Sequence, residues 1–278
     1  MAVEAKCKST GQVLEWLAVQ GVDAFEYQCG RGVHIKTDSA EELGRLAAEH
    51  DISLSLHAPY YISLSSAEEE KRLNSANYLL QSARALRAMG GNRIVLHSGS
   101  AGKLERGQAL ALASETLRYC LERLDEQGYG DMTLCPETMG KMGQLGSLDE
   151  VMQLCLIDER LIPCIDFGHL NARTQGSLRT RADYENILNT IENRLGTGRL
   201  QHFHAHFSKI EYTAGGEKRH LTFSDQTFGP DPQPLLELIA DRKLTPTIIC
   251  ESDGTQAEDA LEMKRMYLKL AGWNTDNS

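Results

Sequence analysis

Residues 133–137 read TLCPE, a short apolar run that ends on the carboxylate of Glu137. Five other runs have the same form, and each ends on or next to a side chain that can bind a metal ion. They are ISLSLH (52–57), RIVLH (93–97), IPCIDF (162–167), FHAH (203–206) and TIICE (247–251). Strands that present such residues at their carboxyl ends are typical of a (β/α) barrel, whose active site lies on that face. The sequence therefore predicts a polynuclear metal site at the mouth of a barrel.

The surrounding sequence alternates between strand and helix patterns without a linker or a low-complexity tract. The predicted strands cover residues 23–29, 51–57, 93–97, 132–137, 162–167, 201–207 and 247–251. The predicted helices cover residues 11–20, 41–50, 67–89, 109–127, 149–155, 181–195, 234–241 and 257–271. Strand starts lie roughly 28 to 46 residues apart, the length of successive βα units with parallel strands. We therefore expect residues 1–278 to form a single α/β domain, a TIM-type (β/α)8 barrel.

The eighth strand of such a barrel would have to come first in the chain. Only MAVEAKC, residues 1–7, precedes the first predicted helix, and this segment holds one β-branched residue. Either this weak strand closes the barrel, or the barrel is incomplete at its seam.

Composition limits the classes of protein that fit. No apolar run approaches the roughly 18 residues of a membrane span. MAVEAKCKST lacks the apolar stretch of a signal peptide, so we expect a cytoplasmic protein. We also expect it to be a monomer. The net charge of −10 argues against a nonspecific nucleic-acid coat, although bound cations would permit a local basic rim. The seven cysteines form no CxxC pair, which favours reduced, packed thiols.

The candidate ligands differ in how strongly they point to a metal. Glu137 and Glu251 each end an apolar run, where an uncompensated carboxylate would cost several kcal/mol, so a cation is the simplest partner. Asp166 and the nearby imidazole form an Asp-x-x-His pair just past a strand. The histidines at 57 and 97 could bind metal or could cap strand ends.

Further candidates come from two histidine-rich segments. In QHFHAH, residues 201–206, three histidines would share one strand face. Of these, His206 lies at the strand end and is the expected ligand. We expect His204 either to contact a ligand without binding the metal itself or to belong to the core. His220, in GGEKRH, is either a ligand or exposed, and His34 and His50 are expected at the surface.

This donor set indicates the metal and the chemistry. Carboxylates and imidazoles without thiolates suit Zn²⁺ or Mn²⁺. Seven or eight such ligands are too many for one ion. Carboxylates that bridge ions roughly 3.5–4 Å apart and bind a phosphate would serve a phosphodiester hydrolase.

The motif series resembles that of the endonuclease IV family, within the xylose-isomerase-like barrels. LHAPYYISLSS, IVLHSGS, PETMGKMGQLGSLDE, CIDFGHLNA, HAHFSKI, KRH and CES carry this resemblance, in the family's order. It implies three zinc ions. The first would be held by His57, His97 and Glu137, the second by Glu137, Asp166, His206 and Glu251, and the third by His169 and His220.

The resemblance also implies an activity, the cleavage of duplex DNA 5′ to an abasic site by a hydroxide generated at the metals. Glu137 and Glu251 would then be essential for catalysis, Tyr60 would lie near the abasic nucleotide, and Arg31 would contact DNA. One position departs from the family, which has an Asp two residues before the last histidine where this chain has Lys218. The adjacent Glu217 could take the place of that Asp, and Lys218 could instead pair with a phosphate.

Two other functions remain open. A sugar isomerase or epimerase of the same barrel group would hold one divalent ion with Glu137, Asp166, His206 and Glu251, and would use the two glutamates to move protons. A barrel that only binds nucleic acid or a metabolite is the non-enzymatic alternative. The histidines at 57 and 97 favour the hydrolase, because a mononuclear sugar site needs neither. The number of bound metal ions would separate these classes.

Overall fold

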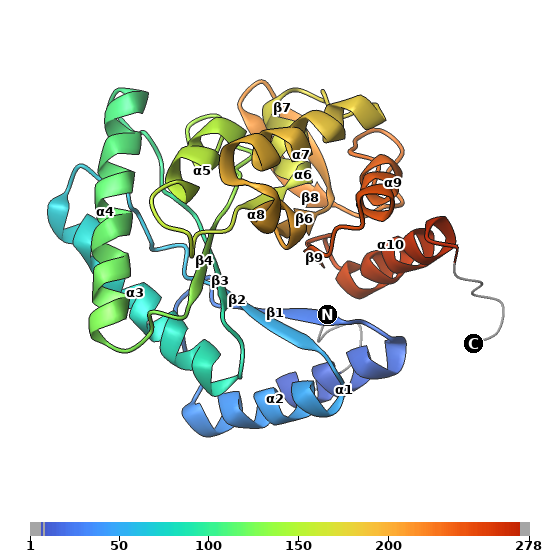
Figure 1. The fold of residues 1–278 in the computed structure, drawn as a ribbon, viewed down its shortest axis with the longest axis horizontal. Coiled ribbons are helices and arrows are strands. Elements are labelled where there is room, and N and C mark those ends of the chain that lie inside the picture. The colour runs from blue at the N-terminus through green and yellow to red at the C-terminus, as the bar shows by residue number, and fades with distance from the viewer. Residues whose placement is uncertain (1–6, 8, 273–278) are drawn as a thin grey trace.

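A computed structural model describes residue 7 and residues 9–272 of the chain. Short parallel strands form its centre, and helices pack around them (Figure 1). The parallel strands are β1 (Ala24–Gln28), β2 (Ser53–His57), β3 (Arg93–Leu96), β4 (Thr133–Pro136), β5 (Cys164–Asp166), β6 (His204–Phe207) and β9 (Thr247–Cys250). The helices are α1 (Thr10–Gln20), α2 (Thr37–Glu49), α3 (Glu69–Ala88), α4 (Arg106–Glu126), α5 (Leu148–Cys155), α6 (Phe167–Arg173), α7 (Arg181–Leu195), α8 (Thr197–Gln201), α9 (Gln233–Arg242) and α10 (Gln256–Leu270).

The strands follow one another around a curved parallel layer. Hydrogen bonds join them in the orders β1-β2-β3-β4 and β5-β6-β9. Isolated parallel bridges, one of which pairs Glu137 with Cys164, connect the two groups. Across the interior, Nη1 of Arg93 on β3 lies 3.1 Å from the hydroxyl of Thr247 on β9. The layer therefore curves back on itself as a barrel does.

An apolar groove marks the seam between β1 and β9. Its lining includes Leu17, Phe25, Ile248 and Met263, and its volume is about 770 Å³. Among the described residues, no strand pairs with the outer edges of β1 and β9. The predicted closing segment, residues 1–7, lies outside the described residues apart from Cys7.

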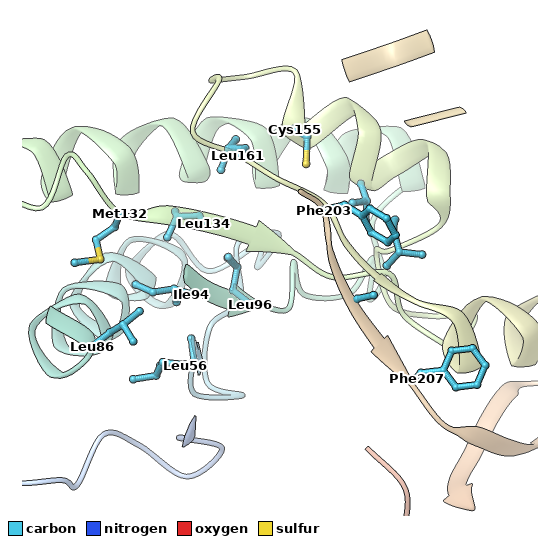
Figure 2. Close-up of a cluster of buried hydrophobic side chains, with 14 of the residues drawn as sticks. Leu56, Leu86, Ile94, Leu96, Met132, Leu134, Cys155, Leu161, Phe203 and Phe207 are labelled. Carbon is cyan, nitrogen blue, oxygen red and sulfur yellow. The ribbon is translucent and has the colours of Figure 1, made fainter. Parts of the chain in front are cut away.

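Side-chain alternation along the strands builds two apolar regions. On β3, Ile94 and Leu96 face outward and pack with Leu56 and Leu134 beneath the helices (Figure 2). Val95 faces inward, where it packs against two fully buried cysteines, Cys135 and Cys164. The other buried cysteines, Cys29, Cys120, Cys155 and Cys250, are free thiols like these two, as the spacing predicted.

The sequence predicts no strand between residues 207 and 247, but the structure has two in the segment 209–221. It forms an antiparallel hairpin of β7 (Lys209–Thr213) and β8 (Gly216–Leu221). Gly216 begins β8 at a φ of 91°, and a Cβ atom there would lie 2.1 Å from the carbonyl oxygen of Gly140. The hairpin is thereby held against the loop that follows β4.

The prediction that three histidines share one strand face was wrong. The chain forms the short helix α8 before β6, so the strand begins only at His204. His202 lies between these elements, with its Nδ1 2.8 Å from the hydroxyl of Thr245.

Within the described part of the chain, no helix is both long and apolar enough to cross a membrane.

Candidate metal centre

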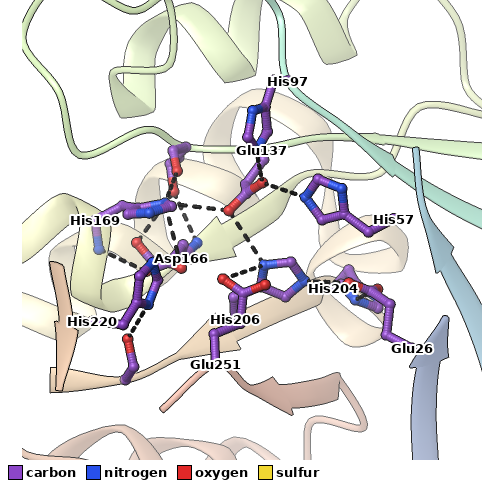
Figure 3. Close-up of polar contacts among 12 residues, drawn as sticks. Glu26, His57, His97, Glu137, Asp166, His169, His204, His206, His220 and Glu251 are labelled. Carbon is purple, nitrogen blue, oxygen red and sulfur yellow. Dashed lines mark hydrogen bonds and ion pairs between the residues drawn. The ribbon is translucent and has the colours of Figure 1, made fainter. Parts of the chain in front are cut away.

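The carboxyl ends of six parallel strands bring the predicted ligands together (Figure 3). The positions are His57 at the end of β2, His97 after β3, Glu137 after β4, Asp166 at the end of β5, His206 in β6 and Glu251 after β9. Two groups of residues result, and within each group the potential ligand atoms lie within 4.8 Å of one another. One is His57, His97 and Glu137, and the other is Glu137, Asp166, His206 and Glu251. Glu137 belongs to both groups.

The carboxylate of Glu137 lies at the centre of the cluster and is 1% exposed. Its Oε2 is 3.3 Å from Nε2 of His57 and 3.0 Å from Nε2 of His97. Its Oε1 is 3.2 Å from Nδ1 of both His206 and His169. One buried carboxylate therefore contacts four imidazoles, an arrangement that could bridge two cations.

Contacts outside the cluster select which ring nitrogen each histidine offers. Nδ1 of His57 lies 3.0 Å from the carbonyl oxygen of Ala58, and Nδ1 of His169 lies 2.9 Å from that of Thr138. A carbonyl only accepts hydrogen bonds, so in the neutral ring each Nδ1 carries the proton and Nε2 keeps the lone pair. The Nε2 atoms then face the candidate ligand groups.

The charges of the cluster are mutually dependent. Burial raises the pKa of Glu137, but the imidazoles of His206 and His97 outweigh it and hold the pKa of this carboxyl well below its usual range. Burial lowers the pKa of His169, but Asp166 and Glu137 reverse the effect and raise it to about 10. Burial also raises the pKa of Asp166. Protons on imidazoles thus balance the buried carboxylates, a role that divalent cations could take over.

A third group joins α6 to the hairpin. It consists of His169, Glu217 and His220, with potential ligand atoms within 4.8 Å of one another. Oε2 of Glu217 lies 3.4 Å from Nε2 of His169. Nδ1 of His220 lies 2.9 Å from the hydroxyl of Ser208, which leaves Nε2 as its possible ligand atom.

A β-bulge explains why Glu217 and not its neighbour takes part. Arg219 pairs with Glu211, and Glu217 pairs with Tyr212, so Lys218 is an extra residue in β8. A bulge of this kind puts residues three apart on the same face. Glu217 and the histidine at 220 consequently point the same way, although the sequence departs from the Asp-x-His spacing.

The three predicted substrate-binding residues have different surroundings. Tyr60 is 58% exposed, and its ring stacks on that of His97 at a centroid distance of 5.1 Å. The backbone N–H of Tyr60 donates to the carbonyl of Gly30. The next residue in the chain is the exposed Arg31, which therefore lies near Tyr60 at the mouth of the barrel. Lys218 is bound to the carboxylate of Glu211, with its Nζ 2.5 Å from Oε1, and does not contact the cluster.

One buried carboxylate near the cluster was missed from the sequence. Glu26, in β1, lies 3.0 Å from Nε2 of His206 and 3.1 Å from Nε2 of His204. Its signal was a charged residue within a strand whose neighbour, Phe25, is apolar and buried. It does not lie at a strand end, where the other candidates were found.

Comparison with known proteins identifies the family. The model of the xylose isomerase-like TIM barrel family matches residues 14–269. The chain belongs to the xylose isomerase-like TIM barrel family. An uncharacterized protein of Methanocaldococcus jannaschii is 35% identical over 241 residues, which cover 87% of this chain and 86% of the relative. A probable endonuclease 4 of Streptomyces avermitilis is 29% identical and is matched over 81% of this chain and 74% of its own length.

Several solved structures share the fold. A D-tagatose 3-epimerase-like protein superposes with a TM-score of 0.73 at 19% identity, and 95% of each chain is covered. Endonuclease IV from Thermus thermophilus gives a TM-score of 0.67 at 17% identity, over 96% of this chain and 95% of its own. The predicted TIM-type fold and the predicted membership of the xylose-isomerase-like barrels are therefore confirmed.

Proposed function

We propose that the protein is a zinc-dependent phosphodiester hydrolase of the endonuclease IV type, which cleaves DNA 5′ to abasic sites. The relatives named probable endonuclease 4 support this proposal. The observation that carries it is the pair His57 and His97, which adds a second ligand group around Glu137 to the one that a mononuclear site would need.

The residues fit divalent cations. All three groups offer only imidazole nitrogens and carboxylate oxygens, the donors that Zn²⁺ and Mn²⁺ accept. Oδ2 of Asp166 is buried, has no hydrogen-bond partner among the described residues, and lies 3.4 Å from Nδ1 of His169, whose proton a cation would replace. A buried carboxylate oxygen in that state is costly unless a cation compensates it. We infer that Glu137 is shared by two ions and that His169, Glu217 and His220 hold a third.

The chain's own residues would hold and orient the substrate. Bound zinc would supply Lewis acidity toward the phosphate and a hydroxide at neutral pH. Exposed Tyr60, supported by the ring of His97, offers a flat apolar surface to a nucleotide displaced from the helix. Arg31 is free to contact a DNA phosphate, whereas Lys218 could do so only by leaving Glu211.

Cleavage of an oligonucleotide duplex with one abasic-site analogue tests the proposal directly. Zinc-loaded protein is expected to cut 5′ to the lesion and to contain two or three zinc ions per chain. His97→Ala should lose most of this activity, because it removes one of the three ligands of its group. The matched control is His50→Asn, at an exposed histidine after α2. Folded, zinc-loaded protein that leaves the duplex intact would contradict the proposal.

A sugar epimerase is the second candidate. Glu137, Asp166, His206 and Glu251 form a four-ligand set on their own, with two glutamates that could move protons. This alternative expects one Mn²⁺ or Mg²⁺ per chain and no effect of His97→Ala on turnover of the sugar. The metal content of the parent and of His97→Ala, measured together with their activities, therefore separates the two functions.

Zinc binding is also expected to release protons. Carboxylates overcome the effect of burial and raise the pKa values of His57 and His169, the latter to about 10. A ring that is protonated at neutral pH must lose its proton before it can bind metal, so the apparent affinity rises with pH. Each released proton contributes up to about tenfold per pH unit. Calorimetric zinc titrations between pH 6 and 8, in buffers of different ionisation enthalpy, measure this release, and a pH-independent affinity would contradict it.

A further inference from the structure

A polar layer lies one step deeper in the barrel than the metal cluster. Glu26 on β1, Ser55 on β2 and His204 on β6 meet there, each buried in the interior (Figure 3). The registers place this layer two residues below His57 and His206. Layers inside such barrels are usually filled by branched apolar side chains, so a buried carboxylate at this depth calls for a specific role.

We propose that Glu26 is a positioning residue, which fixes the ring of His206 so that Nδ1 faces the metal cluster. This inference rests on the proposed function. Oε1 of Glu26 lies 3.0 Å from Nε2 of His206. On the other side of the ring, Nδ1 lies 3.2 Å from Oε1 of Glu137 and 3.5 Å from Oε2 of Glu251. The ring therefore spans the distance between Glu26 and the cluster.

The chemistry of the two ring nitrogens gives the direction. Carboxylates lie beside both nitrogens, but only Nδ1 faces the ligand group of Glu137 and Glu251. With a cation bound there, Nδ1 would give its lone pair to the metal, and the remaining ring proton would lie on Nε2, beside Glu26. Carboxylates behind metal-binding histidines act in this way and also make the ring more basic. The orientation is the reverse of that at His57 and His169, where backbone carbonyls hold Nδ1 and leave Nε2 free. Nε2 of His206 is buried, has no hydrogen-bond partner among the described residues, and lies 3.0 Å from Oε1 of Glu26, which is the nearby acceptor for its proton.

Glu26 is itself held in position. The hydroxyl of Ser55 donates to Oε2 at 2.8 Å, and Nε2 of His204 lies 3.1 Å from the same oxygen. The amide of Gln28 donates to Oε1 at 3.4 Å. With both oxygens engaged, the carboxylate cannot turn away from His206 without breaking buried contacts.

A different use of this layer must be tested at the same time. Cys164, His204 and His206 also have potential ligand atoms within 4.8 Å of one another, so a deeper metal site would use the same ring. If that site were occupied, Cys164→Ala would remove one zinc ion per chain. If Glu26 positions the ring, Cys164→Ala leaves the zinc count unchanged.

The test compares Glu26→Gln with the parent by competition of Zn²⁺ against a chromophoric chelator. Glutamine keeps the size of the side chain but can present its amide N–H groups to Nε2 of His206. We expect a 10- to 100-fold loss of affinity for the most weakened zinc ion, as for other residues of this kind. Nitrogen-15 spectra of the histidine rings in the zinc-loaded parent should show His206 bound through Nδ1 and protonated at Nε2, a signature that a merely structural carboxylate would not produce.

Glu150→Gln is the matched control, because Glu150 is as buried as Glu26 but pairs with Arg106 at the start of α5. It should lower thermal stability without changing zinc affinity. If Glu26→Gln does not fold, Ser55→Ala removes one hydrogen bond from the carboxylate and should still weaken zinc binding several-fold. Unchanged affinity in the folded Glu26 variant, or His206 bound through Nε2, would overturn the inference. A parent that binds zinc with these properties but leaves abasic DNA intact would overturn only the proposed function, and a parent that binds no zinc would overturn both.

Discussion

Glu137→Gln is expected to lower phosphodiester cleavage by about 10³-fold or more while the fold is retained. This carboxylate contacts four imidazoles and belongs to two of the candidate ligand groups. Metal-assisted charge stabilisation contributes several kcal/mol to such reactions, and each 1.36 kcal/mol corresponds to about tenfold in rate. Single-turnover cleavage of the abasic-site duplex, with zinc content measured on the same sample, gives the effect.

The appropriate control is Asp259→Asn. Asp259 is also a buried carboxylate, and it accepts from the backbone N–H of Phe223 and the hydroxyl of Thr255 rather than from the cluster. This variant should keep its zinc and its activity. Cleavage by Glu137→Gln within tenfold of the parent would show that the shared carboxylate is assigned wrongly.

Removal of zinc is expected to have the largest effect on stability. The cluster gathers the buried carboxylates of Glu137 and Asp166 beside His57, His169 and His206. Because these residues come from separate strands, the proposed site would bind cations only in the folded state. At a free zinc concentration of about 1,000 times Kd, binding at one site adds roughly 4 kcal/mol to the free energy of unfolding. For a chain of this size, that corresponds to a fall in Tm on the order of 10 °C when zinc is chelated.

Differential scanning calorimetry with zinc and with an excess of chelator measures this change. Glu137→Gln should show a much smaller difference between the two conditions, because it binds less zinc. The same Tm for the parent with and without chelator would mean that the cluster does not bind zinc at these concentrations.

The position of most of the site could be predicted because strand ends are visible in the sequence. A run such as TIICE shows both the buried strand and the residue that leaves it, and parallel strands bring such residues to one edge. Glu26 had no such marker, since its role depends on β1 lying near β6 at the seam, with β9 between them. That proximity is a property of the curved layer and not of any local pattern.

The errors around the last histidines also have physical reasons. The apolar alternation up to His206 suggested a longer strand, but α8 uses residues 197–201 and leaves His202 outside β6. The sequence predicts no strands for the hairpin of β7 and β8, although Gly215 in its turn and Gly216 directly after it form a Gly-Gly pair, which is a usual hairpin signal. The bulge at Lys218 depends on how two strands pair, which single-sequence spacing does not reveal.

That bulge means that the ligand spacing in this hairpin can vary while the donor geometry stays the same. Removing Lys218 would close the bulge and put Glu217 two positions before His220, on the same face as now. Chains in which the carboxylate lies two or three positions before the histidine can thus present the same carboxylate and imidazole. A sequence pattern that requires one fixed interval would assign such relatives to different groups, whereas a pattern that tolerates a one-residue insertion in β8 would keep them together.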